Sequence, residues 1–108
     1  MPHLFFNNVK EEIVSKLAQE LTLKLSQVSQ IESDWFEYYV QTNKCYTQDA
    51  YQKNNAYIEV KWFKRTSDIK ENIARHLNDY LHQHNYSNVV IYFNELDKDN
   101  YYENMEQF

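Results

Sequence analysis

The feature that most constrains the fold is a helical apolar stripe that occurs twice, with an offset of 56 residues. Apolar residues at four-residue steps are typical of an amphipathic helix with one buried face. Ala18 and Ala74 keep the same offset, and so do Phe6 and Trp62 in the apolar runs that precede the stripes. The sequence therefore predicts two similar units in tandem. The stripes are Ile13, Leu17, Leu21 and Leu25, and Ile69, Ile73, Leu77 and Leu81.

Strand-like runs flank both stripes. Short apolar runs and alternating polar and apolar residues are typical of strands. A chain of 108 residues suits one domain. We therefore predict a first β-α-β unit over residues 1–47, a second over 56–96 and a tail over 97–108, all in a single domain. The predicted strands are Leu4–Phe6, Trp35–Thr47, Tyr57–Phe63 and Val89–Phe93.

The order β-α-β-β-α-β predicts an α/β protein of the α+β type, with a four-stranded mixed sheet and two helices on one face. Two architectures share this order. In the ferredoxin-like one, another strand lies between the two parallel strands of each unit. In the other, the strands of each unit are direct neighbours and the units join through their first strands. Periodicity does not separate the two.

The helix starts carry capping signals. Asn8 stands three residues before Glu11, which predicts an N-cap with its reciprocal partner. Thr66, Ser67 or Asp68 can cap the second helix. Both helices should therefore begin where the preceding strand ends.

Glycine is absent from the chain. Phosphate-binding loops and dinucleotide fingerprints need glycine where the backbone approaches phosphate, so these classes are excluded. Turns must instead use Asn and Asp, which tolerate left-handed backbone. We expect such turns at Asn54–Asn55, Asn85 and Asp97–Asn100.

The net charge and the composition limit the classes of partner and the location that we expect. The net charge of −5 comes without a basic tract, so we expect no nucleic-acid partner.

No apolar run approaches the ~18 residues of a membrane span, and the first residues lack the pattern of a signal peptide. Cys45 is the only cysteine, which indicates a reducing compartment, and we expect a cytoplasmic location. His82 and His84 diverge on a helix, so we expect no metal site.

Pro2 follows Met1 and leads directly into the first predicted strand. Removal of Met1 would leave a secondary amine at the chain end. Together with the duplicated β-α-β pattern, this position resembles the tautomerase superfamily, which includes oxalocrotonate tautomerase and macrophage migration inhibitory factor. The chain is more closely similar to a group of small bacterial proteins of that fold without an assigned activity, including residues 57–65 and the tail Tyr101–Asn104.

The resemblance implies a tautomerase or isomerase that needs no cofactor and assembles as a homotrimer. Pro2 would be the general base acting on a small 2-oxo acid. An amine with a pKa near neutrality can take a proton from the carbon beside a carbonyl and return it elsewhere. Arg65, at the start of the second helix, and Lys10, at the corresponding place in the first unit, would bind the substrate carboxylate.

Two other interpretations stay open. The chain could be a non-catalytic trimer that keeps the fold and binds a small molecule or a protein partner. It could also be a ferredoxin-like binding domain in which Pro2 is coincidental, since proline often starts a strand for steric reasons.

Overall fold

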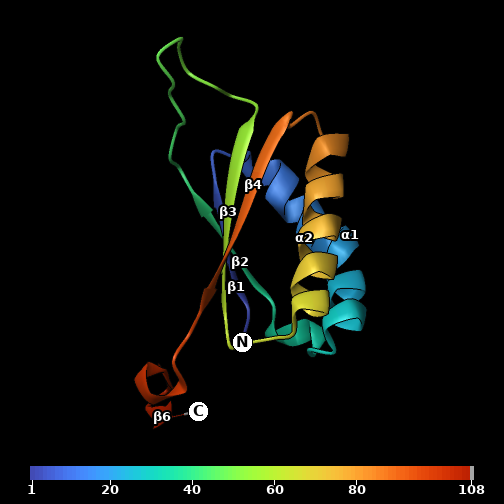
Figure 1. Ribbon diagram of the computed structural model, residues 1–108, viewed down its shortest axis with the longest axis vertical. Helices are drawn as coiled ribbons and strands as arrows, with labels where there is room; N and C mark the ends of the chain where they lie inside the picture. Colours follow the sequence, from blue (N-terminus) through green and yellow to red (C-terminus); the bar gives the residue numbers. More distant parts are fainter. Residues whose placement is uncertain (108) are drawn as a thin grey trace.

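The computed structural model describes residues 1–107. Two long helices and four main strands alternate in the order that the sequence predicts, followed by a short hairpin (Figure 1). The helices are α1 (Glu11–Ser29) and α2 (Ser67–Gln83). The strands are β1 (His3–Asn7), β2 (Glu37–Gln41), β3 (Asn55–Trp62), β4 (Asn88–Glu95), β5 (Tyr102–Glu103) and β6 (Glu106–Gln107), and two short 3-10 helices are η1 (Ser33–Trp35) and η2 (Lys98–Asn100).

The sheet has the strand order β2-β1-β3-β4. β1 pairs with β2 in parallel, β3 pairs with β4 in parallel, and the two units join through the antiparallel pair β1–β3. In the described part of the chain, the parallel partners of each unit are direct neighbours, with no strand between them. The ferredoxin-like interpretation is therefore wrong, and the sheet has the alternative arrangement of two joined β-α-β units.

Both helices cover one face of this sheet (Figure 1). Glu11 and Ser67, the first residues of α1 and α2, keep the 56-residue offset of the apolar stripes. The alternation along β3 sends Ile58, Val60 and Trp62 toward the helices, where all three are buried. The predicted stripes therefore form a shared core. Its fully buried side chains include Leu4, Phe6, Leu17, Leu25, Ile58, Ile73, Leu77 and Leu81.

One of the two predicted caps is confirmed. The Thr66 hydroxyl accepts a hydrogen bond from the Ile69 N–H at the start of α2. The Asn8 prediction is wrong, because the residue that caps α1 is Lys10, which provides no side-chain hydrogen bond. Asn8 instead has a φ of 64°, the left-handed conformation that the turn from β1 into α1 requires.

The second strand is shorter than predicted. Only Glu37–Gln41 are in β2, because the strand lies at the edge of the sheet and pairs with the five residues of β1 alone. Trp35 belongs to η1 instead. Residues 42–54 leave the sheet and form a projecting loop, which the isolated bridge between Tyr46 and Tyr51 holds together (Figure 1).

Asparagine takes much of the role that glycine has in other chains. Asn8, Asn85 and Asn104 have left-handed backbone, as do Gln30 and Met105. The turn at Asn85 is therefore confirmed. Asn54 ends a turn that leads into β3 at Asn55, and Asp97 caps η2; neither segment has positive φ. In the described part of the chain, neither helix is long and apolar enough to cross a membrane.

Candidate functional site

Pro2 is fully buried at the head of β1, an interior strand. Its carbonyl accepts a hydrogen bond of 3.1 Å from the Glu37 N–H, which fixes the start of β1 against β2. The chain start lies beside the loop between β3 and α2 (Figure 1). Burial and this hydrogen bond therefore place Pro2 at one end of the sheet.

Arg65 comes to this same end, because β3 runs antiparallel to β1 and ends near the residues where β1 begins. Its guanidinium donates to the carbonyls of Phe63 (3.4 Å) and Lys64 (3.1 Å). The pKa of the Met1 amine is lowered from 8.0, first because burial disfavours the ammonium form and second because the Arg65 charge repels it. The structure therefore brings Pro2 and Arg65 together.

His3 lies on the sheet face that the helices leave open, and it connects two further residues to this end. Its Nδ1 lies 3.1 Å from the Glu37 carboxylate, and its Nε2 lies 2.8 Å from the Tyr101 hydroxyl. Burial lowers the pKa of His3 from 6.5 more than Glu37 raises it, so the imidazole is neutral at pH 7. Nδ1–H then donates to Glu37, and Tyr101 donates to Nε2.

The C-terminal tail packs over the chain start. The Tyr101 ring meets Phe63 edge-on at 5.1 Å, and the Lys98 ammonium lies 5.5 Å from the centre of the Phe63 ring. We call Pro2, His3, Glu37, Arg65 and Tyr101 the Pro2 cluster. No sequence pattern assigns Glu37 or Tyr101 to a site. The order of the strands brings both residues beside His3, and no local sequence pattern predicts it because it depends on tertiary packing.

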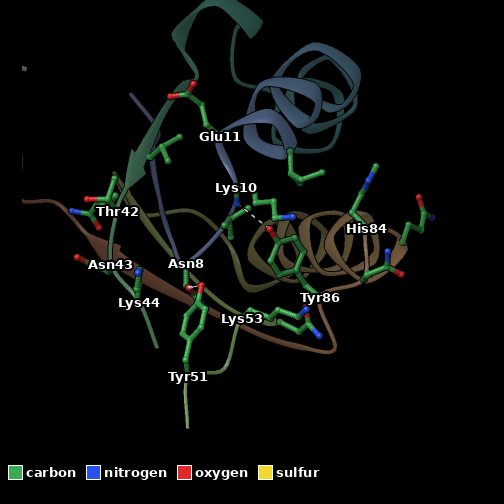
Figure 2. Close-up of a pocket in the computed structure, with 17 residues that line it drawn as sticks. Asn8, Lys10, Glu11, Thr42, Asn43, Lys44, Tyr51, Lys53, His84 and Tyr86 are labelled. Atoms are coloured by element: carbon green, nitrogen blue, oxygen red, sulfur yellow. Dashed lines mark hydrogen bonds between the residues drawn. The ribbon is translucent and has the colours of Figure 1, made fainter. Parts of the chain in front are cut away.

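Lys10, in contrast, lies beyond the other end of β1. The five residues of β1 span roughly 15 Å at the rise of an extended strand. Lys10 lines a cavity of about 790 Å³ together with Asn8, Tyr51 and Tyr86 (Figure 2). Neither Pro2 nor Arg65 lines this cavity. Within one chain, Lys10 therefore stands apart from the Pro2 cluster, and its predicted contact with substrate would need a second subunit.

The described residues offer no metal centre. Among residues 1–107, no group of three or more His, Cys, Asp and Glu side chains is close enough to hold an ion. The side chains available at the Pro2 cluster are a guanidinium, an imidazole, a carboxylate and a phenol, beside the buried Pro2 ring.

Comparison with known proteins places the chain among domains without an assigned activity. The family model described as a domain of unknown function, DUF1904, matches residues 1–107. A crystal structure of a DUF1904 domain from Sebaldella termitidis superimposes with a TM-score of 0.92 at 26% identity, covering 100% of both chains. No curated protein matches the chain.

The fold extends to tautomerase-like proteins. A macrophage migration inhibitory factor-like protein from Entamoeba histolytica superimposes with a TM-score of 0.78 at 21% identity, covering 99% of this chain and 98% of that chain. A fused 4-OT, described as an asymmetric trimer, gives a TM-score of 0.77 at 9% identity, covering 98% and 94%. These likenesses show the tautomerase fold, as the sequence analysis predicted.

Proposed function

The chain belongs to the DUF1904 family, and from this premise and its tautomerase fold we propose that it interconverts the enol and keto forms of a small 2-oxo acid. One observation carries the proposal. Pro2 is buried at the head of an interior strand, beside a guanidinium and in a tautomerase fold. An amine at this place has the surroundings of a general base.

The base would be the secondary amine of Pro2 after Met1 has been removed. Burial and the Arg65 charge already lower the pKa of the Met1 amine, and the Pro2 nitrogen lies one residue deeper in the same surroundings. The same two causes would lower the pKa of the Pro2 amine and so favour its unprotonated form. The amine would take a proton from the carbon beside the carbonyl and return it to the oxygen, or the reverse.

Arg65 would hold the carboxylate of the substrate. Its contacts with the carbonyls of Phe63 and Lys64 involve one terminal nitrogen, so the fork of the guanidinium keeps N–H groups for a carboxylate. The neutral His3 and the Tyr101 phenol would form the wall of the site on the open side of the sheet. No step of this reaction needs a cofactor.

We also propose that the chain assembles as a homotrimer. The sheet face opposite the helices exposes aromatic side chains, and β2 and β4 are open edges. Exposed edges and aromatic patches are protected when subunits pair. The exposed rings on this face are Tyr39, Tyr57 and Tyr92. A non-catalytic trimer is the second candidate, and the same open face supports it.

Two measurements test the proposal. The intact mass of the untagged protein from its own host shows whether Met1 is removed. For the protein that lacks Met1, we expect enol-to-keto conversion of an aryl pyruvate, and a loss of about 10²–10⁴-fold in Pro2→Gly. Circular dichroism controls for folding of the variant.

Retention of Met1 would exclude the amine as the base and leave the non-catalytic trimer. Unchanged turnover in Pro2→Gly would dismiss the assignment. A light-scattering mass of a single chain would contradict the trimer.

A further inference from the structure

The cavity at the Lys10 end of the sheet has no part in the reaction proposed above. It lies where the end of β1, the start of α1, the loop 42–54 and the end of α2 meet (Figure 2). Its volume of about 790 Å³ falls in the range of small-molecule sites. The cavity is therefore large enough for an organic ligand of the size of a metabolite.

The charge around the cavity is positive, although the chain carries a net charge of −5. Lys10, Lys44 and Lys53 line it, and Glu11 is the one carboxylate among its described lining residues. None of the three lysines lies within 4.0 Å of a carboxylate in the described part of the chain. In Figure 2, the Glu11 carboxylate points away from Tyr86. Among the described residues, the three lysines therefore line this open space without an ion-pair partner, and Glu11 is outnumbered.

Tyr86 supplies a buried donor in the wall of this space. Its side chain is only 5% exposed, and its hydroxyl oxygen accepts a 2.9 Å hydrogen bond from the Lys10 N–H. No acceptor among residues 1–107 takes the hydrogen of this hydroxyl. A buried hydroxyl normally donates as well as accepts. This one is placed to donate to a ligand oxygen.

The start of α1 adds backbone donors at the same place. No side chain caps α1, and within residues 1–107 the N–H groups of Glu11 and Glu12 have no hydrogen-bond acceptor. Free N–H groups and the helix dipole favour an anion at a helix start. The lysines, the Tyr86 hydroxyl and these amides therefore all favour an anionic ligand.

Asn8 ties the loop 42–54 to the β1–α1 turn. Its amide donates to the carbonyls of Gln52 (2.8 Å) and Asn55 (2.7 Å), and its oxygen accepts from the Tyr51 hydroxyl (3.2 Å). The Lys44 ammonium lies 5.8 Å from the centre of the Tyr51 ring. The wall that carries Lys44 and Lys53 is therefore fixed to the wall that carries Lys10, so the site is formed before a ligand arrives.

We propose that this cavity binds a small molecule that carries phosphate groups. The lining residues that the structure describes include three lysines and no arginine. Lysine binds phosphate as a point charge, whereas paired recognition of a carboxylate favours the guanidinium fork. Helix N-termini with free amides are likewise phosphate sites. The inference is independent of the tautomerase proposal, because Pro2 takes no part in the site.

Isothermal titration with pyrophosphate tests the inference on the full chain. We expect saturable one-site binding that weakens about tenfold in Lys10→Gln and in Lys53→Gln, because each removes a charged donor. Lys24→Gln is the matched control, since Lys24 is an exposed lysine of α1 that does not line the cavity. Both Lys24→Gln and Pro2→Gly should bind pyrophosphate as the unmodified protein does.

Three outcomes would overturn the inference. The first is no saturable binding up to about 10 mM pyrophosphate, the weakest affinity that the assay would resolve. The second is equal weakening in Lys24→Gln, which would indicate diffuse attraction. The third is citrate binding of equal strength that depends on the same lysines, which would assign the cavity to carboxylates. Loss of turnover in Pro2→Gly with intact pyrophosphate binding would leave both proposals standing.

Discussion

The two ends of the sheet hold their charges in different ways. At the Pro2 end, polar and titratable groups are partly buried and hydrogen-bonded to one another, as in the row Glu37–His3–Tyr101. At the Lys10 end, three lysines line an open cavity, and none of them has an ion-pair partner among residues 1–107. Burial and close neighbours shift proton affinities, whereas unpaired charges in an open cavity attract ions. The first end is therefore suited to moving a proton, and the second to holding an anion.

The largest expected effect tests whether the two ends belong to one cooperative unit. Leu17 is fully buried in the core between them, and Leu17→Ala should lower the free energy of unfolding by about 2–5 kcal/mol. Leu23→Ala is the matched control, since Leu23 on the same helix is 70% exposed, and it should change stability by less than about 0.5 kcal/mol. Urea unfolding followed by tyrosine and tryptophan fluorescence measures both.

The same unfolding experiment can also show whether the two ends of the sheet unfold together. One domain over the whole chain predicts that fluorescence and far-UV circular dichroism report the same midpoint in both variants. Separate transitions would mean that the two ends belong to different folding units.

A smaller effect is expected when the charge beside Pro2 is removed. Arg65→Gln should raise the KM for a carboxylate substrate about tenfold in the protein without Met1. It should also raise the pKa of the Met1 amine in the protein that keeps Met1, because the Arg65 charge lowers that pKa. Enzyme kinetics and NMR titration measure the two effects.

The sign of the pH effect follows from the direction of this pKa shift. A base acts in its unprotonated form, so activity should rise with pH through the pKa of the amine, and the rise should move to higher pH in Arg65→Gln. Arg75→Gln is the matched control, because Arg75 is paired with Glu71 on the exposed side of α2. An identical shift in both variants would assign the effect to net charge alone.

The smallest effect concerns the tail that covers the Pro2 cluster. Tyr101→Phe removes the hydroxyl that donates to His3 and keeps the ring on Phe63. We expect a cost of about 1 kcal/mol to the attachment of the tail, seen as about fivefold faster amide exchange over residues 103–107. Tyr102→Phe is the control, since the Tyr102 side chain is 57% exposed. Equal exchange in the two variants would mean that the His3 contact does not hold the tail.

Local patterns were sufficient for the elements and for part of the site. The stripes, the alternation along β3 and the Thr66 cap depend on neighbours a few residues away, and the structure confirms them. The position of Pro2 before the first strand could be read in the same way. Asn8 was misassigned because its side chain bonds to Gln52 and Asn55, which are distant in sequence.

Periodicity and chain order are local properties, and they were sufficient to predict two β-α-β units, a shared core and a proline at the head of a strand. The pairing of β1 with β3 became visible only in the folded chain. That antiparallel pair brings Arg65 to Pro2 and sends Lys10 to the other end. The pairing of distant strands depends on packing between residues some 50 positions apart in the chain, which no local pattern records.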